Sequence, residues 1–113
     1  MNFTFPSFHS YVNVLPYIYL SGGKYEDDSS QSSNKFLRLK RTGLKTFSSE
    51  VLAPMNTARK NHSSIFIPFL NEVCVIGGSK IKSCERYNIR SNKWSDLPNL
   101  LTSREKASCC LHN

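Results

Sequence analysis

The residues that could do metal or thiol chemistry in this chain are its cysteines and histidines. Near the end of the sequence, "CCLH" brings Cys109, Cys110 and His112 together, and Cys74 and Cys84 lie further upstream. Thiolates and imidazoles are the usual ligands of structural zinc. However, no Cys-x-x-Cys pair is present, and the spacing fits no common zinc module. The sequence therefore predicts no metal site and no cofactor, and it favours cysteines that are buried in strands.

Nucleophilic catalysis needs a nucleophile held beside a base, and phosphate binding needs a glycine-rich loop that opens a helix. The chain has many serines, but none lies in a nucleophile-elbow motif. Its two Gly-Gly pairs are followed by Lys24 and Ser79 and not by a helix start, so they do not form phosphate cradles. We therefore predict no catalytic residues and a protein that is not an enzyme.

Length and charge bound the possible partners. The chain has 113 residues, about one small domain, and a formal net charge of +7. A basic balance raises the possibility of an acidic partner, including nucleic acid. The basic residues are scattered, with their densest cluster at Arg38–Lys45, which argues against nucleic acid. A polyanion-binding β module remains the alternative.

The sequence has no apolar run long enough to span a bilayer. Its first twenty residues lack a basic start and are interrupted by prolines and polar residues, so they make a poor signal peptide. We therefore expect a cytoplasmic protein with no membrane partner, whose cysteines stay reduced.

The elements that would position these residues are strands. Short apolar runs rich in β-branched and aromatic residues, separated by Gly, Pro, Ser and Asn, are typical of an all-β chain. The polar stretch 24–35 indicates a long exposed loop between strands. The expected strands are 10–14, 17–21, 35–40, 44–49, 63–68, 72–77, 83–88 and 93–97, and a ninth begins at 107–112.

The strand pattern occurs twice. "HSYVNVLPYIYLSGG" from His9 matches "HSSIFIPFLNEVCVIGG" from His62, and the two Gly-Gly pairs, starting at Gly22 and Gly77, are 55 residues apart. The equivalent positions of His9 and His62 favour a structural role for both. Downstream, three further pairs align at shorter offsets: Leu39 with Tyr87, Phe47 with Trp94, and Arg59 with Arg104. Insertions confined to one loop, here 24–35, are what a repeat architecture tolerates.

This ordered set resembles the kelch repeat, one blade of a kelch β-propeller. The second copy carries the resemblance on Gly77, Gly78, Tyr87 and Trp94. The first copy is degenerate: it keeps Gly22 and Gly23 but has Leu39 and Phe47 in place of the two aromatic residues. Arg59 and Arg104 match an arginine that often ends the linking segment in this family, and we expect them to hydrogen-bond backbone where blades join.

The resemblance implies an all-β fold of two four-stranded antiparallel kelch-like blades, part of a β-propeller. Residues 1–8 would precede the first repeat at 9–61, the second repeat would follow at 62–106, and 107–113 would start a third. Propellers typically have about four to eight blades. Further blades or self-association would then be needed to close a ring, and an open pair would leave two apolar flanks uncovered.

The function that the resemblance implies is protein–protein interaction, as part of a scaffold or a substrate receptor. Loops between strands would hold the partner, and their candidate contact residues are Lys24, Tyr25, Lys80, Lys82 and Arg90. The same family includes copper radical oxidases, so a fragment of a kelch-like enzyme is a further alternative.

Overall fold

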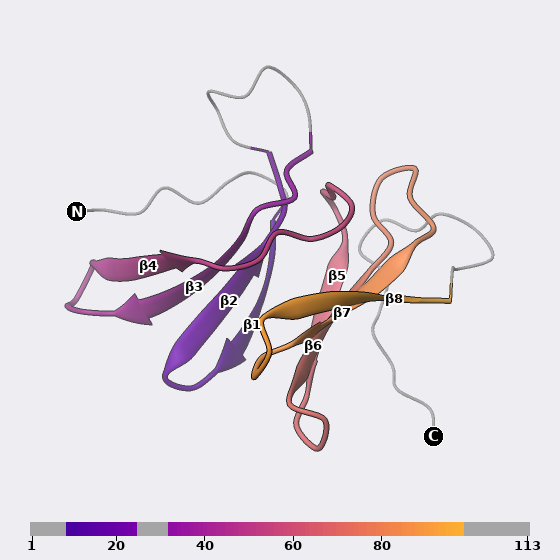
Figure 1. Cartoon of the computed structure of the whole chain (residues 1–113). Helices are drawn as coiled ribbons and strands as arrows, with labels where there is room; N and C mark the ends of the chain where they lie inside the picture. Colours follow the sequence, from indigo (N-terminus) through magenta and orange to yellow (C-terminus); the bar gives the residue numbers. More distant parts are fainter. Residues whose placement is uncertain (1–8, 25–31, 99–113) are drawn as a thin grey trace.

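The described part of the chain, residues 9–24 and 32–98 of a computed structural model, is all-β and contains no helix. Its strands form two four-stranded antiparallel sheets, each in chain order, which lie side by side like two blades of a propeller (Figure 1). The first sheet comprises β1 (Ser10–Val14), β2 (Tyr17–Ser21), β3 (Phe36–Arg41) and β4 (Phe47–Val51). The second comprises β5 (Ser63–Ile67), β6 (Glu72–Ile76), β7 (Cys84–Asn88) and β8 (Lys93–Leu97). The predicted fold class is confirmed.

The expected strands agree with the observed ones to within one residue, except at β4. Residues 44–49 were predicted as strand, but β4 starts at Phe47. The preceding segment is a turn in which the Arg41 guanidinium donates to the carbonyls of Gly43 and Leu44, at 2.7 and 2.9 Å. These bonds hold Leu44 outside the strand ladder. The ninth expected strand lies outside the described residues, as do residues 1–8.

The strand registers relate the two sheets position by position. Gly22 N–H donates to the carbonyl of Lys35, the residue before β3. In the same way, Gly77 N–H donates to the carbonyl of Ser83, the residue before β7. The first residues of these strands, Phe36 and Cys84, are therefore equivalent. On this register Leu39 stands where Tyr87 does, as predicted. The predicted match of Phe47 with Trp94 is wrong. Trp94 pairs with Tyr87, whereas Leu39 pairs with Ser49, and Phe47 lies two residues earlier opposite Arg41.

The core lies between the two sheets. Residues that share a row across antiparallel strands share a face, so Val12 and Tyr19 point from the first sheet toward Val73 and Tyr87 of the second. The inner strands β1 and β5 meet directly, with the Ser10 and Ser64 hydroxyls 2.5 Å apart. Burial of apolar side chains from both blades in one cluster makes the pair a single packed body.

The expectation of two uncovered apolar flanks is only partly met. On the face of the first blade that points away from the second, Leu20 and Leu39 are buried, while Tyr11 and Val51 are exposed. Apolar positions at the centre of this flank are therefore shielded from water, and those at its border are not.

Among the described residues no helix is long and apolar enough to cross a membrane.

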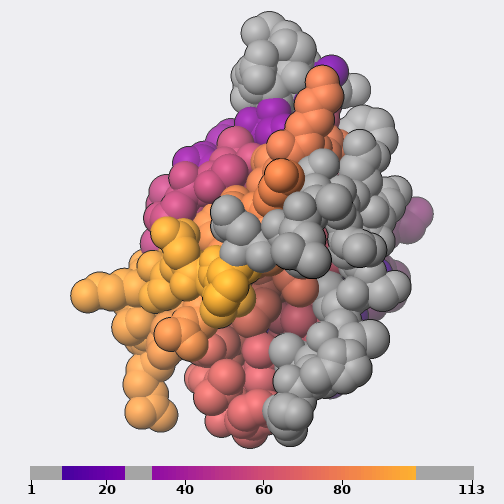
Figure 2. Space-filling model, turned by 90° about the vertical axis from the view of Figure 1, so that its right-hand side faces the viewer, coloured from indigo at the N-terminus to yellow at the C-terminus, as the bar shows by residue number. Residues whose placement is uncertain are grey.

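The connections between strands lie at two opposite ends of the sheets, the turn end and the joint end. The turn end carries the four hairpin turns, at 15–16, 42–46, 68–71 and 89–92. The joint end carries the β2–β3 and β6–β7 connections and the linker from β4 to β5. Figure 1 shows the hairpin turns toward the left and the bottom, and the β6–β7 connection and the linker from β4 to β5 toward the top. In Figure 2 the orange β7–β8 hairpin projects from the lower left of the surface.

Candidate functional site

The two Gly-Gly pairs are anchored to the backbone of the linker between the blades. Gly23 N–H donates to the Arg59 carbonyl at 2.7 Å, and Ser79 N–H donates to the Lys60 carbonyl at 3.0 Å. Gly22 has φ +62°, and a Cβ at this position would lie 2.3 Å from the Arg59 carbonyl oxygen. Only glycine can adopt this conformation at this distance without strain. The linker is thus clamped between the turn that follows β2 and the turn that follows β6.

The Arg59 side chain completes the joint from the linker into the second blade. Its guanidinium pairs with Glu85 at 3.0 Å, and neither side chain is exposed. The remaining N–H groups donate to the carbonyls of Gly77 and Ser83 and to the Ser83 hydroxyl. A guanidinium can satisfy several acceptors at once because its donors form a rigid fork. The predicted role of Arg59, hydrogen bonding to backbone at the blade join, is confirmed; Arg104 lies outside the described residues.

Glu85 is the residue of this joint that sequence reasoning missed. Its carboxylate also accepts from the backbone N–H groups of Asn56 and Thr57, at 2.7 and 3.1 Å. A buried carboxylate needs such donors because removing a charge from water is costly. The signal in the sequence was slight: an acid inside a strand whose other core positions are apolar. Leu37 occupies the equivalent position in the first blade.

His62 lies under the first Gly-Gly turn. Its Nε2 atom is 2.7 Å from the Ser21 hydroxyl, and its Nδ1 atom is buried without a hydrogen-bond partner in the described structure. Burial, with a contribution from the positive charge of Arg59, lowers the pKa of His62 to about 4. The ring is therefore neutral in the fold at neutral pH. This agrees with the structural role that its position in the repeat predicted.

Four aromatic rings fill the space between the blades. Tyr19 and Phe36 come from the first blade, and Tyr87 and Trp94 come from the second. Their ring centroids lie 4.6 Å apart for Phe36 and Tyr87 and 4.8 Å apart for Phe36 and Trp94, both with edge-on geometry. Such arrangements are the favoured ones for aromatic pairs. Sequence reasoning found the second pair of rings from the repeat and missed the first pair.

The polar atoms of Tyr87 and Trp94 both take part in hydrogen bonds that reach the linker, directly or through Asn92. The Trp94 indole N–H donates to the Ala53 carbonyl at 2.8 Å. The Asn92 side-chain oxygen accepts from the Tyr87 hydroxyl at 2.7 Å and from Ala53 N–H at 3.0 Å. Burial raises the pKa of the Tyr87 phenol to about 12, so it stays a donor. The motif residues Tyr87 and Trp94 therefore tie the linker as well as pack.

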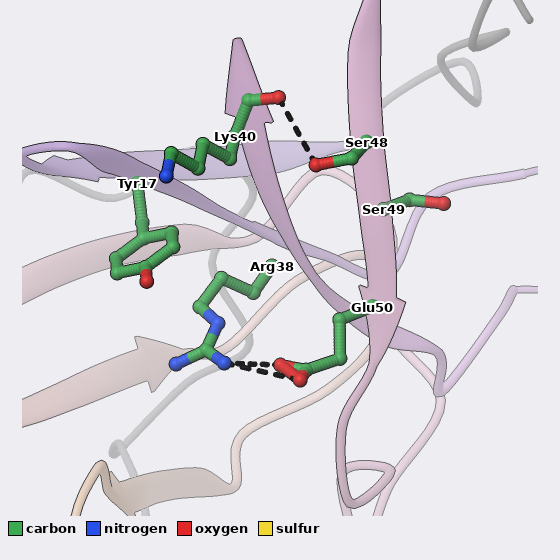
Figure 3. Close-up of a pocket in the computed structure, with 6 residues that line it drawn as sticks. All are labelled: Tyr17, Arg38, Lys40, Ser48, Ser49 and Glu50. Atoms are coloured by element: carbon green, nitrogen blue, oxygen red, sulfur yellow. Dashed lines mark hydrogen bonds and ion pairs between the residues drawn. The ribbon is translucent and has the colours of Figure 1, made fainter. Parts of the chain in front are cut away.

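A small open pocket of about 180 Å³ lies on the outer part of the first blade, on the face that carries Tyr19 (Figure 3). Arg38 donates to Glu50 from the neighbouring strand, at 3.0 Å to one carboxylate oxygen, and its guanidinium carbon lies 4.5 Å from the centre of the Tyr17 ring. Figure 3 shows Tyr17 between Arg38 and Lys40. Ser48 and Ser49 complete the lining. Since Arg38 is already paired, Lys40 is the cation that this pocket offers to a ligand.

The predicted partner-contact residues are not brought together. Lys80 and Lys82 are exposed in the β6–β7 connection, and Lys24 is half-buried after β2, so these three lie at the joint end. Arg90 is exposed in the β7–β8 turn, at the opposite end of β7. Tyr25 lies outside the described residues. The set therefore divides into two separate surfaces.

Cys74 and Cys84 are buried in strands, as the sequence indicated. They occupy the positions in β6 and β7 that Tyr19 and Phe36 occupy in the first blade. Cys109 and Cys110 lie outside the described residues. Across residues 9–24 and 32–98 no three His, Cys, Asp or Glu side chains gather closely enough to hold a metal ion.

Two solved structures share this arrangement of strands. A novel fungal alcohol oxidase of the AA5 family, in complex with copper, matches 88% of this chain with a TM-score of 0.75 and 14% sequence identity. The protein YjhT matches 99% of this chain with a TM-score of 0.72 and 18% identity. The chain spans 23% and 33% of the lengths of these two proteins. No protein-family model and no curated protein matches the sequence.

The comparison corrects one prediction. The sequence indicated a protein that is not an enzyme, on the ground that it contains no catalytic motif. The match to an alcohol oxidase overturns that inference, because this fold is one that an enzyme uses over nearly the whole length of the chain. A missing local motif is weak ground for excluding an enzyme, since one fold can carry sites of many kinds.

Proposed function

We propose that this chain provides two consecutive kelch-type blades of a β-propeller and that they act as a protein-interaction module. The observation that carries the proposal is the clamped joint. Hydrogen bonds from Gly23 and Ser79 to the linker fix the Gly22-Gly23 and Gly77-Gly78 turns relative to each other. Loops held in place before binding lose less entropy when a partner arrives, so their side chains bind more tightly.

The contact surface that we assign to this function is the joint end. Lys80 and Lys82 are exposed there, and the backbone of Lys80 is fixed at φ +59° by the turn that it closes. The residues beside it, Ser79 and Ile81, both donate to backbone carbonyls. Basic side chains on a fixed turn suit an acidic surface of a protein partner.

A photo-crosslinking amino acid in place of Lys80 or Lys82 tests this proposal in cells. The control position is Ser95, which is exposed on the outer strand β8. We expect one protein to crosslink saturably from the two lysine positions and not from Ser95. With that protein purified, the double variant Lys80→Glu/Lys82→Glu should weaken binding at least about tenfold, because opposed charges at an interface cost several kcal/mol. Equal crosslinking from all three positions would contradict the proposal.

The second candidate function is that of a section of a propeller oxidase, and the match to the fungal alcohol oxidase favours it. The residues described here do not by themselves form a copper site, because no suitable ligand cluster occurs among them. The metal ligands would have to come from the rest of the chain or from further blades. Copper titration followed by elemental analysis, together with oxygen consumption on a panel of alcohols, tests this candidate. Stoichiometric copper and alcohol-dependent consumption would support it, and their joint absence would exclude it.

A further inference from the structure

Exposed apolar side chains are concentrated at the turn end. Among the described residues six large apolar side chains are strongly exposed, and four of them lie in hairpin turns. These are Leu15 at 91%, Leu44 at 89%, Phe69 at 74% and Leu70 at 47% of full exposure. Single exposed apolar residues are common on protein surfaces. Exposed apolar side chains that gather in the turns of both blades, at the same end of the strands, indicate a binding surface.

Each blade places cations next to its apolar turns. In the first blade Lys45 follows Leu44 directly, and Lys40 and Arg41 end the strand before this turn. In the second blade Arg90 lines the same shallow pocket of about 300 Å³ as Phe69 and Leu70. The two blades thus repeat one composition, apolar tips beside exposed Lys and Arg, although their turn sequences differ.

Acidic residues are kept away from this surface in the described structure. Glu72 begins β6 beside the β5–β6 turn, but it is buried and faces Arg86 at 3.9 Å. Glu50 is paired with Arg38, Glu85 is buried at the joint, and Asp96 lies toward the far end of β8. Within residues 9–24 and 32–98, the turn end therefore presents positive charge and apolar tips with no exposed carboxylate between them.

We propose that the turn end docks on an anionic lipid surface. Apolar side chains on projecting turns can enter the boundary between headgroups and acyl chains. Each Lys or Arg near an anionic membrane adds about 1 kcal/mol of attraction. A protein partner would instead need a continuous patch of about 800 Å², whereas these tips stand on separate turns, as Figure 1 shows toward the left and the bottom. Lying on a membrane needs no spanning helix, so the absence of an apolar span does not bear on it.

Vesicle flotation with the full 113-residue chain tests this inference, because aggregates sediment and do not float. We expect the chain to float with vesicles of phosphatidylcholine mixed with phosphatidylserine and not with phosphatidylcholine alone. The variant Leu15→Ser/Leu44→Ser/Phe69→Ser should lose at least about tenfold in vesicle affinity. Its control, Val51→Ser, changes a side chain that is 78% exposed at the joint end and should bind as the parent does. Circular dichroism checks that each variant keeps its strands.

Two variants of equal net charge distinguish docking through the turn end from the diffuse attraction that a net charge of +7 would cause anywhere on the surface. Lys45→Glu/Arg90→Glu and Lys80→Glu/Lys82→Glu carry the same net charge, but only the first pair lies at the turn end. We expect the first to lose at least about tenfold in affinity for anionic vesicles and the second to lose much less. Equal losses would overturn the proposal, as would a lack of flotation. Unchanged flotation of the triple serine variant with displacement by soluble polyglutamate would assign the surface to an acidic protein segment instead.

Discussion

Replacing Arg59 with Met tests the joint between the blades. In the parent chain the Arg59 guanidinium and the Glu85 carboxylate are fully buried at 3.0 Å. The methionine would leave Glu85 with only the backbone N–H groups of Asn56 and Thr57. It would also leave the Gly77 carbonyl without the donor that now lies at 2.9 Å. Removing one partner of a buried pair costs about 3–5 kcal/mol, because the other charge stays buried without compensation.

That cost is a large share of the stability of a small domain, which is about 5–15 kcal/mol. Urea unfolding followed by Trp94 fluorescence measures it, since Trp94 lies at the same joint and is the single tryptophan. We expect the midpoint to fall while the slope of free energy against urea stays unchanged. The matched control is Arg59→Met/Glu85→Leu, which copies Leu37 of the first blade. It should recover at least about 2 kcal/mol of the loss, since no buried charge remains. A single variant within about 1 kcal/mol of the parent would refute this account of the joint.

Three further predictions concern the same region. Gly22→Ala should destabilise the chain by more than about 2 kcal/mol in urea unfolding, because its Cβ would lie 2.3 Å from the Arg59 carbonyl at a positive φ; a loss below about 0.5 kcal/mol would contradict the clamp. Trp94→Phe keeps a ring but removes the 2.8 Å bond to Ala53, so it should cost about 1 kcal/mol, whereas Trp94→Ala should cost about 3–5 kcal/mol in the same assay. The pKa of His62 falls from 6.5 to about 4 on folding, so the unfolded chain binds the extra proton and stability should drop as the pH falls from about 6.5 to about 4. His62→Gln should remove this component, which amounts to roughly 3 kcal/mol, and an identical pH slope in both proteins would refute it.

Much of the fold could be predicted from the sequence because it depends on local patterns. Alternating and β-branched runs bounded by turn residues located every described strand, and most boundaries were correct to one residue. The exception was the start of β4, where Arg41 bonds to carbonyls of the turn and delays the strand. A hydrogen bond from a side chain to the backbone of a turn leaves no periodic pattern in the sequence, so it could not be predicted. It also shifted the predicted match of Phe47 by two residues, since the turn length sets the register of the outer strand.

The joint was only partly predictable for a different reason. Arg59 could be placed from the repeat, because Arg104 occupies the matching position at the end of the second copy. Its partner Glu85 could not, since the equivalent residue of the first blade is Leu37 and no second copy marks the position. Tyr19 and Phe36 were missed similarly. They look like ordinary strand residues, and only the packing of two sheets shows that they face Tyr87 and Trp94.

The direction in which each blade points its aromatic residues explains why a degenerate first copy still makes a well-packed joint. Tyr87 and Trp94 face the preceding blade, so their counterparts Leu39 and Ser49 lie on the face of the first blade that points away from the second. The joint instead uses Tyr19 and Phe36, whose counterparts on the far face of the second blade are Cys74 and Cys84. Cysteine is much smaller than tyrosine or phenylalanine, and interiors tolerate no large voids. A blade that packs on that far face must therefore approach more closely, or fill the space with more side chains, than the second blade does against the first. The two blades are not interchangeable, and a ring that contains them has a fixed order of neighbours.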